Sequence, residues 1–325
     1  MLKVLAEKGL IRGRAIGVDA TTLEANAAMR SIVRREDGTT YHDFLVSLAK
    51  QSGIETPTRA DLARIDKKRE KKGSNDDWKS PTDPDAKITK MKDGRTHLAH
   101  KAEHATDMDS GAVLAVTVQD ATRGDSASLK TTMVITALNM AELAADPSCS
   151  EKISPQALKT WVADKGYHSN ETMRMTAELG LTTYISEPDR GQRKWKGEEL
   201  ARRGTYDNRR RITRRTREGP TAATRGAAGA QLRTHAGETG GMRRTHLRGH
   251  ENVLKRYLVH VAGFNLGLVM RAILLGVGTP RGLQGRLAAC FDTLAALWMH
   301  VKSLHVDGRD LLRWKPRLRP ILAVA

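Results

Sequence analysis

The sequence predicts a mixed α/β fold in which helices cover the faces of a sheet. Short apolar runs of strand length alternate along the chain with longer segments of helical periodicity. Apolar residues make up 39% of the 325 residues, which is enough for a sizeable core, although only 4% are aromatic. The order strand, hairpin, helix, strand, helix, strand, basic segment, helix therefore indicates one mixed sheet flanked by helices.

The first half of the chain contains the predicted hairpin. Residues 15–19 form a short apolar run and are expected to be a buried strand, whereas 21–50 are expected to be helical or mixed. Residues 66–86 are charged and rich in turn formers, which indicates an exposed loop or insertion. Residues 95–106 and 111–120 are expected to pair, because an Asp-Ser-Gly turn joins them.

The second half alternates helices and short strands. Apolar spacing and turn residues predict a helix over 126–145 capped by Ser126, a strand at 161–164, a helix over 170–179, a strand at 182–186 and a long helix over 250–275. Gly263 and Gly267 are expected to let that last helix pack closely. The residues after it, 276–325, are expected to form a basic helical tail.

Composition narrows the class of protein. The formal net charge is +18, and residues 188–217 contain twelve Lys or Arg against four Asp or Glu. Such an excess favours a polyanionic partner, most simply nucleic acid. No apolar stretch approaches the roughly 18 residues of a membrane span, and the first residues lack the apolar core of a secretory signal peptide. The two cysteines, Cys149 and Cys290, are too few for a disulfide framework or a Cys-rich zinc site. We therefore expect a cytoplasmic protein that does not enter a membrane.

Two carboxylates occupy the same local context. Asp19 and Asp164 each end a short apolar strand and precede small or polar residues. Such a residue can simply form a turn or cap a helix. Carboxylates that converge at strand ends can also hold two divalent cations for phosphodiester cleavage. The residue types alone leave both interpretations open.

Longer motifs surround both carboxylates. Residues 17–27 read Gly-Val-Asp-Ala-Thr-Thr-Leu-Glu-Ala-Asn-Ala, and residues 162–169 read Val-Ala-Asp-Lys-Gly-Tyr-His-Ser. They resemble the first and second catalytic blocks of bacterial insertion-sequence DDE transposases. Residues 183–188 resemble the strand after the second block, and 238–244 and 248–256 resemble the segment after the third. The resemblance covers roughly residues 10–285.

The resemblance implies an RNase H-like mixed sheet, Mg²⁺ or Mn²⁺ as cofactor, and DNA as substrate, both element ends and target. It implies that Asp19 and Asp164 are catalytic metal ligands in a transposase domain over 15–275. Residues 1–14 would then be the remnant of an N-terminal helical region. The resemblance also implies a bacterial protein, and it leaves open whether the protein is a homodimer. The residues expected to bind DNA phosphates are Arg209, Arg210, Arg211, Arg214, Arg215, Arg243, Arg244, Arg248, Lys255 and Arg256.

The chain departs from the family at the third block, where a Glu-Arg pair is expected. Residues 221–233 contain no carboxylate. One allowed set of codons for them, read one nucleotide later, encodes Leu-Leu-Arg-Arg-Gly-Glu-Leu-Leu-Glu-Arg-Ser-Phe, with the missing Glu across Gly229 and Ala230. We therefore predict a displaced reading frame and poor packing over 217–234. The fallback third carboxylate is Glu187, while Glu238 and Glu251 match family positions outside the catalytic set.

Three functions follow from this interpretation. The first is a metal-dependent transposase whose DNA cleavage and strand transfer are impaired by loss of the third carboxylate. The second is a catalytically inactive DNA-binding remnant, which needs no metal to bind DNA. The third is a host nuclease of the same fold class, which would cut DNA without specificity for element ends.

Overall fold

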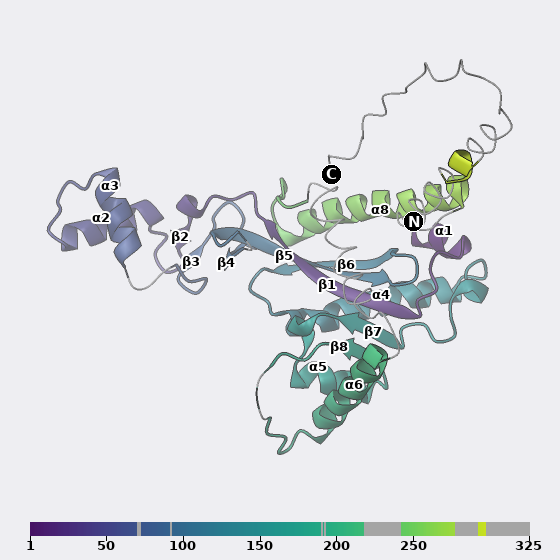
Figure 1. Ribbon diagram of the computed structural model, residues 1–325. Coiled ribbons are helices and arrows are strands. Elements are labelled where there is room, and N and C mark those ends of the chain that lie inside the picture. The colour runs from purple at the N-terminus through teal and green to yellow at the C-terminus, as the bar shows by residue number, and fades with distance from the viewer. Residues whose placement is uncertain are drawn as a thin grey trace, which may run out of the picture. The chain divides into compact units, whose positions relative to one another are not determined.

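The protein is described from a computed structural model, in which residues 1–69, 73–91, 93–189, 191, 193–217, 242–276 and 292–296 are placed (Figure 1). The chain divides into two compact units, Met1–Met270 and Arg271–Ala325. The first unit contains the sheet and nearly all described elements. The predicted anomalous stretch 217–234 lies outside the described residues apart from Arg217, as does nearly all of the tail.

A mixed sheet forms the centre of the first unit, which confirms the predicted fold class in its coarse form. The described strands are ordered β4-β5-β1-β7-β8, and β6 pairs with β5 on the same edge as β4. β5 is antiparallel to each of its neighbours, whereas β1, β7 and β8 are mutually parallel. The strand bounds are β1 (Ala15–Glu24), β4 (Lys87–Lys90), β5 (Thr96–Asp107), β6 (Val113–Asp120), β7 (Thr160–Ala163) and β8 (Thr182–Ile185).

The predicted hairpin and both short strands are present, but the first strand is longer than expected. β1 continues through Glu24 because each of its residues from Ile16 onward pairs with β5. The expectation of helical or mixed structure from residue 21 is therefore wrong over 21–24. The polar and small side chains there suit either conformation, and pairing with a distant strand selects the extended one.

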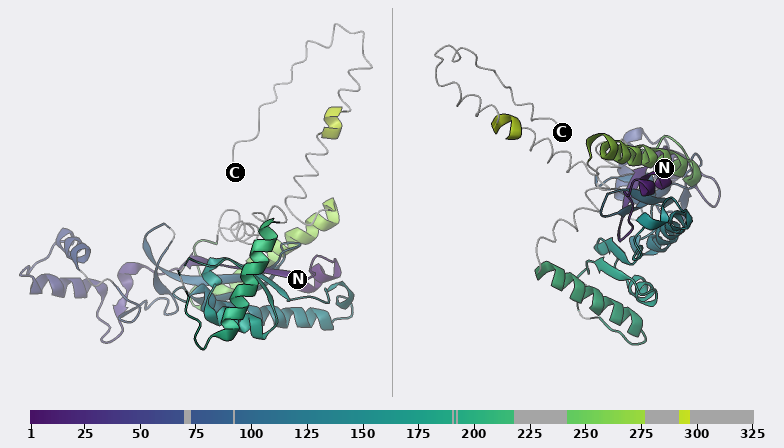
Figure 2. Two further views of the ribbon diagram at one scale, coloured as in Figure 1. Left: turned by 60° about the horizontal axis from the view of Figure 1, so that its bottom comes forward. Right: turned by 90° about the vertical axis from the view of Figure 1, so that its right-hand side faces the viewer.

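Helices cover both faces of the sheet (Figures 1 and 2). Along β5 the side chains alternate, as a strand requires. Glu103 bonds to residues of α4 on one face, while the ring of the next residue, His104, lies 4.9 Å from that of Tyr257 in α8. The helix bounds are α1 (Leu2–Glu7), α4 (Asp125–Ala145), α5 (Asn170–Glu178), α6 (Glu199–Arg217) and α8 (His250–Leu275), with 3-10 turns η1 (Met29–Ser31), η2 (Ser150–Lys152) and η3 (Lys165–Tyr167).

The helix predictions are confirmed within one or two residues, apart from one cap. Residues 126–145, 170–179 and 250–275 match α4, α5 and α8 closely. The N-cap of α4 is Gly124 rather than Ser126. Ser169 caps α5, because its side chain accepts the Thr172 N–H at 3.0 Å.

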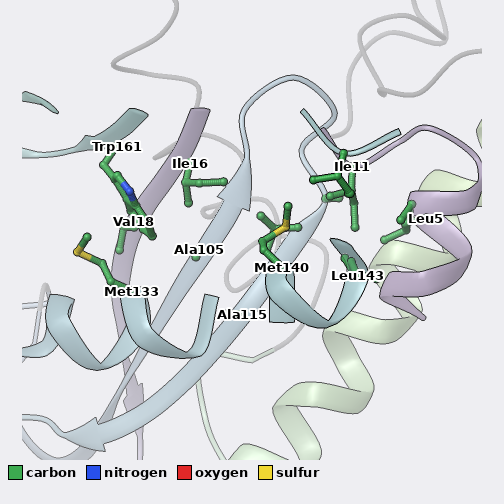
Figure 3. Close-up of a cluster of buried hydrophobic side chains, with 14 of the residues drawn as sticks. Leu5, Ile11, Ile16, Val18, Ala105, Ala115, Met133, Met140, Leu143 and Trp161 are labelled. Atoms are coloured by element: carbon green, nitrogen blue, oxygen red, sulfur yellow. The ribbon is translucent and has the colours of Figure 1, made fainter. Parts of the chain in front are cut away.

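The main apolar core lies between the sheet and α4 (Figure 3). Ile16 and Val18 of β1 point into it together with Trp161 of β7, and Met133 and Met140 of α4 close it. All five side chains are less than a tenth exposed, which makes this cluster a principal source of stability. Because β1 and β7 are both buried here, the residues that directly follow this paired stretch are held by a rigid core.

Asparagines satisfy the backbone at both outer edges of the sheet. Asn208 of α6 donates to the Ile185 carbonyl at 2.7 Å and accepts the Ile185 N–H at 3.1 Å. Asn265 of α8 bonds the N–H and carbonyl of Val113 in the same way, at 3.0 and 2.9 Å. All four residues are buried, so unpaired edge groups there would be costly.

Residues 25–86 form an insertion between β1 and β4 that has its own small core. It contains α2 (Tyr41–Gln51), α3 (Arg59–Lys68) and a two-stranded sheet of β2 (Val33–Arg34) and β3 (Trp78–Lys79). The rings of Tyr41 and Phe44 meet Trp78 edge-on at 5.2 and 5.3 Å. Residues 66–86 belong to this insertion, which was one of the two expected alternatives, but they are not an exposed loop throughout. Residues 66–68 end α3, and Trp78 and Asp83 are buried. One aromatic residue organises this core, so no periodic pattern reveals it.

Of the described helices, α8 is long and apolar enough to cross a membrane by length and composition, over His250–Leu274. The expectation that no segment approaches that limit is thus wrong. Val253, Tyr257 and Val261 of α8 are nevertheless buried against the sheet. A Cβ on Gly263 would meet no atom within 4 Å, so close packing does not explain that glycine.

Candidate active site

Strand register brings the two predicted catalytic carboxylates together. β1 and β7 are parallel, and Val18 is the register partner of Ala163. Asp19 and Asp164 each follow directly, so they lie side by side where the pairing of β1 with β7 ends. Asp164 follows the last residue of β7, as predicted. Asp19 lies within β1, because pairing with β5 continues that strand to Glu24, so the prediction that Asp19 ends its strand is wrong. Asp19 is half-buried and Asp164 is exposed. The pair therefore stands at a solvent-accessible sheet edge above a rigid core.

Backbone groups orient both side chains. Asp19 Oδ1 accepts the N–H of Ala20 at 2.8 Å. Asp164 is the N-cap of η3, and its Oδ1 accepts the Gly166 N–H at 2.7 Å. In this respect the alternative interpretation of Asp164 as a cap is also correct. The second oxygen of Asp164 is not needed for capping, so the same residue can cap the turn and contact a ligand.

Gly166 allows a third carboxylate to approach this turn. A Cβ at this position would overlap Asp125 Oδ2 and lie 3.0 Å from Asp164 Oδ1. Asp125, the first residue of α4, is held by Lys101 Nζ at 2.5 Å. The Asp-Lys-Gly-Tyr motif thus needs glycine at this position because two carboxylates flank it. Sequence reasoning missed Asp125, which lacks any strand-end context.

Beneath the turn lies a buried polar network that sequence reasoning also missed. Glu103 is fully buried on β5 and accepts hydrogen bonds from three hydroxyl groups. Ser128 Oγ donates to Glu103 Oε1 at 2.5 Å, Tyr167 OH donates to the same oxygen at 3.0 Å, and Thr132 Oγ1 donates to Oε2. Burial raises the pKa of Glu103, and these hydrogen bonds oppose that rise. No alternating pattern marks Glu103, because residues 98–107 of β5 are buried on both faces of the strand.

The pKa of Tyr167 also reports the surrounding charge. Burial raises it most, and the nearby carboxylates of Glu103, Asp125 and Asp19 raise it further. The Tyr167 hydroxyl therefore stays protonated and serves as a donor. The same three carboxylates show that the turn lies in an acidic environment.

The fallback residue Glu187 lies at the same end of the sheet but is already engaged. It follows β8, which is parallel to β7. Its carboxylate lies 2.9 Å from Arg193 Nη1 and 2.5 Å from Arg209 Nε. Hydrogen bonds from Arg209 lower the pKa of Glu187. A carboxylate neutralised by two guanidinium groups is a poor metal ligand, so this arrangement favours an anchoring role.

The remaining predicted position for the third carboxylate, Gly229–Ala230, lies outside the described residues. Within the described ranges, no group of three or more His, Cys, Asp or Glu side chains has the geometry to hold a metal ion. Asp19 and Asp164 fit a hard cation in donor type, because Mg²⁺ prefers carboxylate oxygens and solvent. They would provide two protein ligands.

The arginines of α6 divide into anchored and outward-facing side chains. Arg209 is tied to Glu187, and the Arg211 guanidinium donates to the carbonyl and hydroxyl oxygens of Thr183 at 3.2 Å. Arg210 is 81% exposed and Arg214 is also exposed. The side chain of Arg215 is outside the described set. The predicted phosphate-binding role therefore fits Arg210 and Arg214 better than Arg209 and Arg211.

The other predicted basic residues lie near the end of β1 and on α8. Arg243, Arg244, Arg248, Lys255 and Arg256 are all exposed. Arg244 lies 3.9 Å from Glu24, Arg248 donates to the Asn26 carbonyl at 3.3 Å, and Lys255 pairs with Glu251 at 2.7 Å. Arg244 and Arg248 line one surface pocket with Asn26, Ser31 and Thr82.

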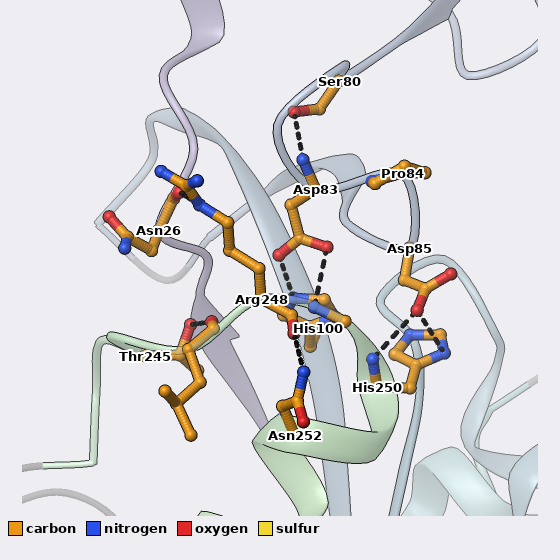
Figure 4. Close-up of polar contacts among 12 residues, drawn as sticks. Asn26, Ser80, Asp83, Pro84, Asp85, His100, Thr245, Arg248, His250 and Asn252 are labelled. Atoms are coloured by element: carbon orange, nitrogen blue, oxygen red, sulfur yellow. Dashed lines mark hydrogen bonds and ion pairs between the residues drawn. The ribbon is translucent and has the colours of Figure 1, made fainter.

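A buried Asp–His contact and two backbone hydrogen bonds join this basic segment, β5 and the insertion (Figure 4). Asp83 Oδ2 lies 2.9 Å from His100 Nε2, and Asp83 Oδ1 accepts the Gly249 N–H at 3.1 Å. Asp85 accepts the N–H of His250 at 2.9 Å. The insertion, β5 and the start of α8 are thereby joined.

Comparison with known proteins adds no further assignment. Neither a protein-family model nor a curated protein matches this sequence.

Proposed function

We propose that the chain is an insertion-sequence DNA transposase with a DDE-type active site in an RNase H-like fold. The observation that carries this proposal is the parallel register of β1 and β7, in which Asp19 of β1 lies beside Asp164 at the carboxyl end of β7. The strand order, with β5 alone reversed among its neighbours, supports the RNase H-like interpretation of the mixed sheet. The sequence motifs around both carboxylates point to the same chemistry.

Asp19 and Asp164 would hold Mg²⁺ or Mn²⁺ at this edge. When bound, such ions activate a water molecule or a 3′-hydroxyl group and stabilise the leaving oxygen of a phosphodiester. The protein's own contribution is to fix both carboxylates through the backbone N–H groups of Ala20 and Gly166. With Glu187 neutralised by arginines, the missing carboxylate near Gly229 and Ala230 leaves the site incomplete. Cleavage and strand transfer by this chain are therefore proposed to be strongly impaired.

DNA would be held by the outward-facing arginines. α6 contains eight arginines against two carboxylates, and its exposed members can pair with phosphates without reading bases. The exposed segment from Arg243 to Arg256 adds a second basic surface near the end of β1. This binding requires no metal, so DNA affinity and cleavage are separable.

The test compares cleavage and binding in the same preparation. The purified full chain is incubated with duplexes carrying the ends of its genetic element, or with scrambled duplexes, in Mg²⁺, Mn²⁺ or EDTA. We expect salt-dependent DNA binding in all three conditions and slow, end-specific cleavage only with a metal. Asp19→Asn and Asp164→Asn should remove the product and retain binding. Asp109→Asn, an exposed turn carboxylate that pairs with Arg14, is the matched control.

A second arm tests the missing carboxylate. Replacing residues 221–233 with the segment encoded by the displaced frame should raise the cleavage rate by orders of magnitude. If the unsubstituted chain and the chain with residues 221–233 replaced both bind DNA but yield no cleavage product, the inactive DNA-binding remnant is favoured. Equal cutting of end and scrambled DNA would favour a nuclease. Absence of DNA binding at low salt would refute the proposal.

A further inference from the structure

A buried side chain attaches the turn that carries Asp164 to the protein interior. Tyr167 lies three residues after Asp164, is fully buried, and ends the 3-10 turn η3. Its hydroxyl donates to Glu103 across a sequence separation of 64 residues, at 3.0 Å. One end of the turn is therefore held by the Asp164 cap and the other by a buried carboxylate.

Glu103 is itself held from several directions. Its two oxygens accept from Ser128 and Thr132 of α4, and Lys101 Nζ donates to the same Ser128 hydroxyl at 3.0 Å. Lys101 also holds Asp125, the carboxylate that flanks Gly166. A buried polar network with every member bonded is rigid, because each alternative arrangement leaves a buried group unpaired.

We propose that Glu103 and Tyr167 are positioning residues for Asp164. The network of Lys101, Glu103, Ser128, Thr132 and Tyr167 fixes η3 against β5 and α4, so that the Asp164 carboxylate stays beside Asp19. Neither Glu103 nor Tyr167 contacts a substrate, because both are fully buried. The functional part of this inference rests on the proposed metal-dependent site, whereas the structural part does not.

The chain offers a matched pair of buried tyrosines for the test. Tyr167→Phe removes the hydroxyl that donates to Glu103. Tyr257→Phe also removes one buried hydroxyl, but the structure gives that hydroxyl no hydrogen-bond partner among the described residues. Both substitutions keep the ring and its packing, so both variants of the full chain are expected to fold. Glu103→Gln is a third variant that keeps the shape and one acceptor oxygen.

Backbone hydrogen exchange over residues 164–169 is the first measurement. Tyr167→Phe should speed exchange of these amides by about ten-fold, because the turn opens more often once its anchor is lost. Tyr257→Phe should leave them unchanged, and Glu103→Gln should fall between. Unchanged exchange in Tyr167→Phe, or an equal change in Tyr257→Phe, would overturn the proposal.

Mn²⁺ binding, followed by electron paramagnetic resonance, is the second measurement. The chain should bind Mn²⁺ more tightly than its Asp164→Asn variant, and Tyr167→Phe should weaken that site by about ten-fold. If the unsubstituted chain and Asp164→Asn bind Mn²⁺ alike, the proposed metal site fails, and with it the functional part of this inference. The rates of backbone hydrogen exchange over residues 164–169 would then still show whether the network positions the turn. If Mn²⁺ binds but Tyr167→Phe binds it equally well, positioning is wrong and the proposed function stands.

Discussion

Replacing Asp83 with Ala should destabilise the first unit far more than its place in a charged, turn-rich segment suggests. Asp83 is fully buried, and its two oxygens serve different parts of the fold. One lies 2.9 Å from His100 Nε2 on β5, and the other accepts the Gly249 N–H at the start of α8. The carboxylate therefore links the insertion to two elements that are distant in sequence.

The expected loss of stability follows from the buried polar groups that Asp83→Ala leaves without a partner. His100 is fully buried, and its other ring nitrogen, Nδ1, has no hydrogen-bond partner among the described residues. Asp83→Ala would leave the whole imidazole and the Gly249 N–H without acceptors. Each unpaired buried polar group costs about 1–3 kcal/mol. We expect a loss of about 3 kcal/mol, which lowers Tm by roughly 6–12 °C in a unit of this size.

Urea unfolding of the full chain, followed by tryptophan fluorescence, measures this loss. Asp85→Ala is the matched control, because Asp85 also accepts an N–H at the start of α8 but has a side chain that is 49% exposed. The control should lose about 1 kcal/mol or less, as is usual for one exposed cap. Equal losses in the two variants, or a loss below about 1 kcal/mol for Asp83→Ala, would refute the argument that burial of the pair determines the cost.

Three further predictions concern α6, α8 and the end of β8. Gly204→Ala should destabilise the fold by about 2 kcal/mol, because its Cβ would lie 2.5 Å from a backbone carbonyl of α5. Gly263→Ala on α8 should instead stabilise the fold by about 0.5–1 kcal/mol, because that Cβ would meet no atom within 4 Å. Thermal unfolding of both variants measures these opposite changes in stability. Asn208→Leu should cost about 2–4 kcal/mol in urea unfolding, because it leaves the backbone N–H and carbonyl of β8 unpaired in a buried place. Arg209 lowers the pKa of Glu187 below 4.5, so this ion pair stabilises the folded chain above pH 4.5, and its contribution is lost as the pH falls through the lowered pKa. Glu187→Gln should therefore make the free energy of unfolding less dependent on pH below 4.5. Identical stability–pH profiles of the two chains would show that the pair contributes nothing.

Local sequence patterns were sufficient for much of the fold. The helices α4, α5 and α8 and the strands β5 to β8 agree with prediction within a few residues, because each carries its own apolar periodicity or turn signals. The position of Asp164 at a strand end was also readable, since it follows an apolar run directly. The same signal was wrong for Asp19, because pairing with β5 extends β1 to Glu24. The proximity of Asp19 and Asp164 was an expectation that the parallel register of β1 and β7 supports.

Features that depend on distant partners could not be predicted in this way. The extension of β1 through Glu24 depends on pairing with β5, and the core of the insertion depends on Trp78 meeting Tyr41 and Phe44. No local pattern in those segments distinguishes the observed conformation from its alternatives. Tertiary pairing overrides weak propensity there.

The anchored residues of the site illustrate the same limit. Glu103 and Tyr167 are 64 residues apart, and Glu187 and Arg209 are 22 apart, yet each pair shares a hydrogen bond. Residue types and strand-end spacing identify which carboxylates could perform chemistry, because those signals are local. Whether a given charge is buried, neutralised by arginine or left open to solvent depends on side chains brought together by packing, and that selection among the candidates is made by the folded chain.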